Sequence, residues 1–361
     1  MSYENIWPCW VALIMWVTHL EYLLHLLTIA FLADAWDVIV KITFSESLGF
    51  LENGYDFNNT LKTSEKAMDY FSLVAQMPWL DNLLNKNLVF QIRPPLFREI
   101  TAFSAQKLYD QLEKTGANNS PNEPDFLDNF IQAKSEYPKI VDDTQVISYL
   151  MINMIAGADT TAITLTMILY FLLKNPEVWK HLQDEIPIQS LNSGPGICSY
   201  SNSKSKPYLR AVVYESTRLH PAVAMPLERY VPEGGLILPN GQYIPQGCII
   251  GINPHTIGRN PLVYDDPEEF RPERWLPGPH ESEDDYQKQL LLMKNSDLTF
   301  GAGSRMCIGK NLALLQVYKI VATLVSCYNI SLAHPDDEWT THNSFFLCQQ
   351  DVRVTICPRQ K

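Results

Sequence analysis

The chain has 361 residues, of which 46% are hydrophobic and 19% are charged, as is usual for a globular protein with a large core. Its formal net charge of −12 argues against nucleic acid as a partner, because phosphate binding needs clustered Lys and Arg. Seven cysteines without a C-x-x-C pair argue against a disulfide scaffold and a zinc ribbon, and they favour a reducing compartment.

Residues 1–34 form an apolar segment without Lys or Arg. The run from Ile6 to Leu20 also lacks Asp and Glu, until Glu21 interrupts it. A carboxylate costs about 2.5–3.5 kcal/mol at the centre of a bilayer, and no basic region precedes the apolar run. Two interpretations stay open for this segment, a membrane anchor and a buried or interfacial helix. We expect residues 35–361 to form a single domain.

The middle of the chain reads as helices separated by polar loops. The clearest helix covers residues 144–173, with Asp142 or Asp143 as its N-cap and Asn175-Pro176 as its stop. About 30 residues at 1.5 Å each span ~45 Å, enough to cross a domain. The other predicted segments are helix over 22–52, loop over 53–66, helices over 66–112 broken at Pro78 and Pro94-Pro95, a connector over 114–124 and loop over 190–206.

The C-terminal part changes character after a helix over residues 207–220, which ends at Pro221. Glycines and prolines then separate short β-like runs at 236–238, 243–244 and 248–252. We further predict a polar loop over 276–297, a helix from near Cys307 to about Tyr328, and a strand over 352–356. The expected fold class is mainly α with a smaller β portion (α+β).

The run FGAGSRMCIG, from Phe300 to Gly309, places one cysteine in a glycine-rich turn before a helix. Glycines permit positive φ and close approach to a flat ligand. Backbone N–H groups at a helix N-terminus stabilise a thiolate, which is a strong donor to haem iron. Arg305 could pair with a haem propionate. The alternative is an inert cysteine in a turn, and the agreement of ten positions argues against it.

Two further patterns are weak alone. Glu215 and Arg218 are three residues apart and can pair on one helical face, which is usually a solvated pair. The segment AGADTT, residues 156–161, puts Gly and two Thr inside the long helix, where a Thr hydroxyl can bond to a preceding carbonyl and open the helix. An acid beside a hydroxyl there can pass protons. The alternative is an ordinary packed helix with Gly157 at a tight crossing.

The cysteine run resembles the F-x-x-G-x-R-x-C-x-G signature of the cytochrome P-450 family, with every defined position present. The other patterns resemble the family's E-x-x-R pair, its partner arginine in the PERW segment (Arg274), and the oxygen-activation motif A-G-x-D-T-T. The resemblance extends from about Ala35 to the C-terminus and is closest to filamentous-fungal microsomal members.

The resemblance implies non-covalent haem b with the Cys307 thiolate as axial iron ligand. It places Phe300, Gly301, Gly303, Arg305, Gly309 and Arg229 around the haem, with both arginines as propionate partners. It implies that Glu215, Arg218 and Arg274 form a buried structural network. It assigns oxygen protonation to Thr160 and Asp159, and substrate contact to apolar stretches at 154–164, 222–226 and 343–346 (Met154, Ile155, Ala222, Val223, Ala224, Met225, Phe345 and Phe346).

The expected function is a monooxygenase that inserts one atom of O2 into a small lipophilic substrate, in secondary metabolism. A separate reductase would supply electrons, because no G-x-G-x-x-G fingerprint is present. We expect the cytosolic face of the endoplasmic reticulum membrane if the chain is anchored, and the cytoplasm otherwise.

Family chains carry more sequence ahead of this region. We therefore expect a cytochrome P-450 fold that is incomplete at the N-terminus, with poor haem binding. Two rival functions stay open. One is a truncated, non-catalytic haem binder, and the other is a membrane-bound structural protein, which only residues 6–33 favour.

Overall fold

The computed structural model describes residues 27–53, 60–86, 97–115, 124–188, 197–336, 338–350 and 353–359. Helices dominate this part of the chain, and the strands form four two-stranded antiparallel sheets. The predicted class, mainly α with a smaller β portion, is confirmed. The helices are α2 (Leu27–Phe44), α3 (Phe50–Asn53), α4 (Thr60–Gln76), α5 (Pro78–Leu84), α6 (Arg98–Thr115), α7 (Phe126–Glu136), α8 (Asp143–Lys174), α9 (Pro176–Glu185), α10 (Tyr200–Lys204), α11 (Pro207–Leu219), α12 (Pro254–Ile257), α13 (Glu283–Ser296) and α14 (Lys310–Cys327), with 3-10 turns η3 (Pro272–Trp275) and η4 (Gly303–Arg305).

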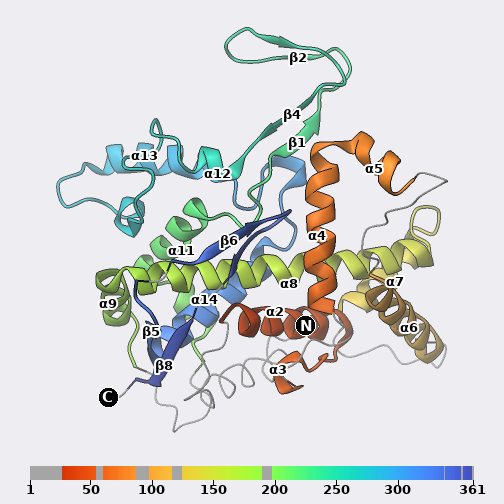
Figure 1. Cartoon of the computed structure of the whole chain (residues 1–361), viewed down its shortest axis with the longest axis horizontal. Coiled ribbons are helices and arrows are strands. Elements are labelled where there is room, and N and C mark those ends of the chain that lie inside the picture. Colours follow the sequence, from red (N-terminus) through yellow and green to blue (C-terminus); the bar gives the residue numbers. More distant parts are fainter. Residues whose placement is uncertain are drawn as a thin grey trace. The chain divides into compact units, whose positions relative to one another are not determined.

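The strands pair as four two-stranded ribbons, of which β2–β3 and β6–β7 join consecutive strands. The β1–β4 ribbon continues into the β2–β3 hairpin (Figure 1). The pairs are β1 (Leu227–Tyr230) with β4 (Ile249–Ile252), β2 (Leu236–Ile237) with β3 (Tyr243–Ile244), β5 (Tyr328–Leu332) with β8 (Val354–Pro358), and β6 (Thr340–Asn343) with β7 (Leu347–Gln350).

The described residues fall into two compact units. Of the described residues, unit 1 contains those up to Thr166, Ile188 and those from Cys327 onward, and unit 2 contains Met167–Pro187 and Ile197–Ser326. Helix α8 therefore begins in unit 1 and ends in unit 2. The expected boundary after residue 34 falls inside α2, and residues 1–26 lie outside the described part, so the separate N-terminal segment and the single domain stay predictions.

Helix α8 is the long helix that the sequence predicts. Its N-cap is Asp142, whose carboxylate accepts a hydrogen bond of 2.8 Å from the Gln145 N–H. It ends immediately before Asn175-Pro176. Among the described residues α8 is the one helix long and apolar enough to cross a membrane, and 61% of its most apolar window is buried inside the protein. The anchor predicted within residues 6–33 lies mostly outside the described part.

Helix α2 crosses α8 closely at Gly157. A Cβ atom on this glycine would lie 2.9 Å from Cδ1 of Ile39, which is buried on α2. The interpretation of Gly157 as a residue at a tight crossing is therefore confirmed. The expected opening of the helix is wrong, because α8 stays α-helical throughout. The hydroxyls of Thr160 and Thr161 donate to the carbonyls of the preceding turn, at 2.8 and 2.9 Å, without breaking the helix.

Several predicted loops are helical. The 276–297 segment contains α13, where the Ser282 hydroxyl accepts from the Asp285 N–H at 3.2 Å and three acidic residues in the first turn favour the helix dipole. Its sequence lacks an apolar stripe because Met293 is its one buried residue. Helix α10 lies within the predicted 190–206 loop, and α4 begins at Thr60 within the predicted 53–66 loop.

Candidate active site

Cys307 lies in a tight loop that η4 shapes just before α14. Gly301 and Gly303 adopt φ of +68° and +65°, a region that glycine enters without strain. The Cys307 N–H donates to the Phe300 carbonyl at 2.9 Å, which closes the loop. Helix α14 begins at Lys310, three residues later than the sequence predicts. The Cys307 thiol is free and exposed.

Strand β1 lies beside this loop. A Cβ atom on Gly301 would be 3.9 Å from Cδ1 of Leu227, the first residue of β1. Arg229 follows Leu227 by two residues and therefore projects from the same side of the strand. The Arg229 guanidinium is exposed and donates a hydrogen bond of 2.6 Å to the backbone carbonyl of Glu228. Arg305 is also exposed, and no ion pair joins it within the described residues.

These features fit a flat, apolar, anionic group that carries a metal. The exposed thiol can reach a metal, and a Cβ on Gly309 would come into van der Waals contact with the Cys307 sulfur, at 3.8 Å, so Gly309 lies directly beside the thiol. Met306 and Ile308 expose apolar side chains next to it. The described residues hold no cluster of three or more His, Cys, Asp and Glu side chains suited to a metal. A single thiolate ligand does not require such a cluster.

The Glu215 carboxylate is fully buried and accepts five hydrogen bonds. Arg218 binds both of its oxygens, at 2.8 and 2.9 Å, in a fork-like arrangement. Arg274 and the indole N–H of Trp275 donate at 2.9 Å, as does the backbone N–H of Arg271. The predicted residues Glu215, Arg218 and Arg274 therefore do lie together, and the interpretation as a solvated pair is wrong.

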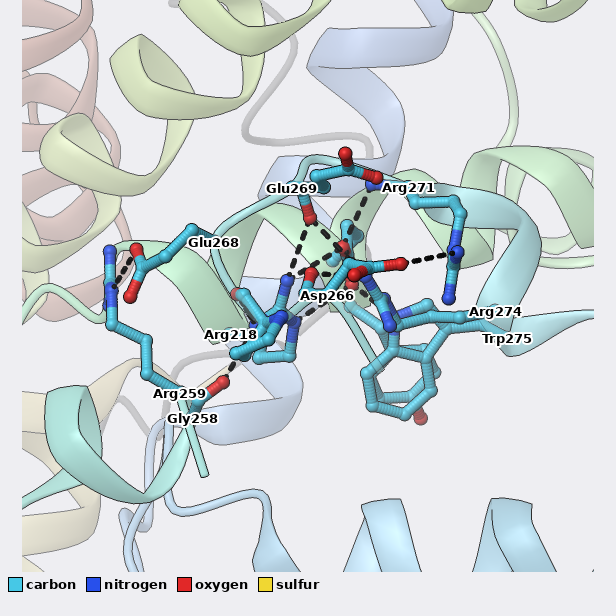
Figure 2. Close-up of polar contacts among 12 residues, drawn as sticks. Arg218, Gly258, Arg259, Asp266, Glu268, Glu269, Arg271, Arg274 and Trp275 are labelled. Carbon is cyan, nitrogen blue, oxygen red and sulfur yellow. Dashed lines mark hydrogen bonds and ion pairs between the residues drawn. The ribbon is translucent and has the colours of Figure 1, made fainter. Parts of the chain in front are cut away.

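The two arginines also bind backbone carbonyls of the segment between α12 and η3 (Figure 2). Arg218 donates to the carbonyls of Gly258 at 2.7 Å, Pro267 at 2.6 Å and Glu269 at 3.0 Å. Its guanidinium also lies 4.9 Å from the Tyr264 ring centre. Arg274 donates to the Asp265 carbonyl at 2.6 Å. Arg218 of α11 and Arg274 of η3 thus together hold the irregular segment from Gly258 to Glu269 in place.

The other predicted site residues, Asp159 and Thr160, belong to unit 1. The Ser64 hydroxyl on α4 donates to the Asp159 carboxylate at 2.7 Å. Burial raises the pKa of Asp159 to about 6, although the hydrogen bond from Ser64 opposes this shift by favouring the charged form. Thr160 donates instead to the Ala156 carbonyl. Cys307 belongs to unit 2, so the gathering of all three residues in one site stays a prediction.

Unit 1 contains a cavity of about 870 Å³. Its walls come from α4, α5, α8 and the turn between β6 and β7, where Phe345 and Phe346 lie. Of the predicted substrate-lining residues it includes Ile155, Phe345 and Phe346, whereas Met154 is a core residue that does not line it. The α4 wall is not predicted from the sequence, because no motif marks Met68, Phe71 and Val74. Residues 222–226 belong to unit 2, and their predicted role is untested.

Comparisons with known proteins point to the same family as the cysteine run does. A family model described as cytochrome P-450 matches residues 28–357. Cytochrome P-450 monooxygenase cfoH of Aspergillus candidus is 44% identical over 330 residues, which cover 90% of this chain and 60% of that protein. Cytochrome P-450 monooxygenase cicH of Emericella nidulans is 36% identical over 330 residues, covering 90% and 64%. The chain thus spans less than two thirds of the length of these relatives.

A solved structure, the haem domain of cytochrome P-450DA, aligns with a TM-score of 0.77 at 16% identity. The alignment covers 99% of this chain and 73% of that chain. At this level of identity the likeness speaks to the fold, and it confirms the fold that the sequence predicts.

Proposed function

Because the chain belongs to the cytochrome P-450 family, we propose that it is a haem-dependent monooxygenase that inserts one atom of O2 into a small lipophilic substrate. Haem b, when bound to the Cys307 thiolate, supplies the oxygen-activating chemistry. A separate reductase supplies the electrons. The observation that carries this proposal is the exposed Cys307 thiol, held in a glycine loop directly ahead of α14.

The residues around the proposed haem site have three tasks in this proposal: they bind the iron, shape the loop and bind the propionates. The thiolate of Cys307 is the protein's ligand to iron. Phe300, Gly301, Gly303 and Gly309 shape the loop so that the thiol lies open to a flat ligand. Arg305 and Arg229 bind the propionates, which suits guanidinium groups that are exposed in unit 2. The Glu215 network holds the segment between α12 and η3 in place, and this segment precedes the cysteine loop in the chain.

Asp159 and Thr160 handle protons. A carboxyl with a pKa of about 6 exchanges its proton near neutral pH, which suits a general acid or base. Ala156 lines the cavity, and Thr160 lies one helical turn after it on α8. The two residues therefore share the face of α8 that borders the cavity. In this proposal Asp159 holds the proton, and Oγ1 of Thr160 passes it on.

The cavity supports a lipophilic substrate. Its volume lies within the usual range of roughly 300–1,000 Å³ for small-molecule sites. Its walls are mainly apolar, with Phe71, Ile152, Ile155, Phe345 and Phe346 among them. We infer a role in secondary metabolism from the kind of relatives that the chain resembles. We place the protein at the cytosolic face of the endoplasmic reticulum if it is anchored, and in the cytoplasm otherwise.

The test is a set of cysteine variants of the whole chain. The reduced protein under carbon monoxide should show the red-shifted Soret band that thiolate ligation produces, and Cys307→Ala should abolish it. Cys248→Ala and Cys357→Ala are matched controls, because both cysteines are also free and exposed. A Cys307→Ala variant that keeps the band would overturn the assignment. Haem binding without product in the presence of a reductase would favour the non-catalytic alternative.

A further inference from the structure

The hydrogen bond between Ser64 and Asp159 joins two helices that are far apart in the sequence. Ser64 lies on α4, is 2% exposed, and donates its hydroxyl hydrogen to Oδ2 of Asp159 at 2.7 Å. The two residues are 95 positions apart, and no motif includes Ser64. In the described part of the chain Asp159 has no ion pair with a Lys or Arg side chain.

The surroundings of Asp159 otherwise disfavour a negative charge. Asp159 is half-buried, and loss of contact with water is the largest influence on its pKa. Cys348 on β7 approaches it, and the pKa of that thiol is raised to about 12 by burial and then by the charges of Asp159, Glu65 and Asp69. The ionised carboxylate is therefore stabilised by the Ser64 hydroxyl, which donates a hydrogen bond to it.

Ser64 and Asp159 each lie on the helical face whose other residues line the cavity. On α4, Ser64 shares a face with Met68, Phe71 and Ala75, at spacings of four, seven and eleven residues, and these three line the cavity. On α8, Asp159 shares a face with Ser148, Ile152 and Ile155 at the same spacings, and these also line it. Figure 1 shows α4 crossing α8. Ser64 and Asp159 do not line the cavity themselves; each lies one helical turn beyond a lining residue, Met68 on α4 and Ile155 on α8, and their hydrogen bond joins the two helices there.

We propose that Ser64 is a positioning residue for Asp159: its hydroxyl orients the carboxylate against α4, so that the carboxyl group takes up and releases its proton from one fixed position at the end of the cavity. The Ser64–Asp159 contact itself is independent of haem. Its value for catalysis rests on the proposed function, in which Asp159 is the proton-holding group.

The experiment compares two variants of equal volume in the full chain, Ser64→Thr and Ser64→Val. Threonine keeps the hydroxyl and valine removes it. The protonated Asp159 carboxyl is followed by infrared spectroscopy across pH, and its band is identified by its absence in Asp159→Asn. Ser64→Val should raise the titration midpoint by about one pH unit, a tenfold change in the ionisation constant, whereas Ser64→Thr should stay near the original midpoint.

Ser72→Ala is the control on the same helix, because its hydroxyl donates to the backbone carbonyl of Asp69 and not to Asp159. Its midpoint should be unchanged. If Ser64→Val and Ser64→Thr titrate alike, the proposal is wrong. Ser64→Ala gives the same comparison should valine prevent folding. The titration needs no haem, so a failed thiolate spectrum and a failed titration are separate results.

In the haem-loaded protein, the pH at which half of the consumed electrons appear as peroxide should move with the titration midpoint in Ser64→Val. A purely structural role for Ser64 would lower haem content or turnover at every pH and leave this pH unchanged. That outcome would also overturn the proposal.

Discussion

Replacing Arg218 with Ala should destabilise unit 2 severely. The guanidinium donates two hydrogen bonds to the buried Glu215 carboxylate and three to backbone carbonyls. Its side chain is 3% exposed and that of Glu215 is 0% exposed, so water cannot replace the lost donors easily. Removing one partner of a buried ion pair costs about 3–5 kcal/mol. Arg274, Trp275 and the Arg271 N–H still bind Glu215, which limits the loss.

The magnitude decides the outcome because domains of this kind are stable by only about 5–15 kcal/mol. Arg218→Ala therefore removes a large share of the free energy of unfolding. Urea unfolding followed by circular dichroism measures it directly. Arg218→Lys should fall between the wild type and Ala, because an ammonium keeps the charge but cannot bind both carboxylate oxygens and three carbonyls together.

Arg259→Ala is the matched control within the same region (Figure 2). Arg259 also pairs with a glutamate at 2.9 Å, but the Glu268 side chain is 72% exposed. Such a pair contributes about 0–1 kcal/mol. If Arg218→Ala and Arg259→Ala lower the free energy of unfolding equally, burial does not strengthen the Glu215 network and the argument fails.

Three further results are expected. Thr160→Ala should bind haem and substrate as the wild type does but release more peroxide per electron consumed, and unchanged coupling would remove Thr160 from proton transfer. Burial raises the pKa of Asp159 to about 6, so the native state binds the Asp159 proton more tightly than the unfolded state does. Asp159 should therefore lower the free energy of unfolding as the pH rises from about 4 to above 6, by up to about 3 kcal/mol. Asp159→Asn should remove this term, so its stability relative to the wild type should increase across that window in parallel urea titrations; a constant difference would contradict the shift. Gly157→Ala should cost about 1 kcal/mol, since overpacking against Ile39 outweighs the gain in helix propensity, and Ile39→Val should recover part of the loss in the same measurement.

The sequence was informative where the decisive residues are neighbours in the chain. The cysteine loop depends on two glycines with positive φ within six residues of Cys307, and that geometry is written into a contiguous run. The length and both ends of α8 follow from an apolar segment between Asp142 and Asn175-Pro176. Local preferences of this kind need no knowledge of the remaining chain.

Hydrophobic periodicity did not predict an element that buries few apolar side chains, or one that depends on pairing with a strand distant in the sequence. Helix α13 keeps most of its surface exposed and so shows no apolar period, and strand β1 is defined only by its pairing with β4. The sequence also offered a choice at Gly157, between an opened helix and a tight crossing, and only the approach of Ile39 decided it.

The sequence by itself indicated the family, the proposed thiol ligand Cys307 and, through the family resemblance, the three members of the buried ionic network, because the cysteine run and the Glu215–Arg218 pair are residue types at short, fixed spacings. Tertiary structure alone decided that the Glu215 carboxylate collects donors from residues up to 60 positions away, and that Ser64 meets Asp159 across 95 positions. The physical reason is that a buried charge must be compensated by whatever the fold brings within about 3 Å, and chain order does not encode that distance.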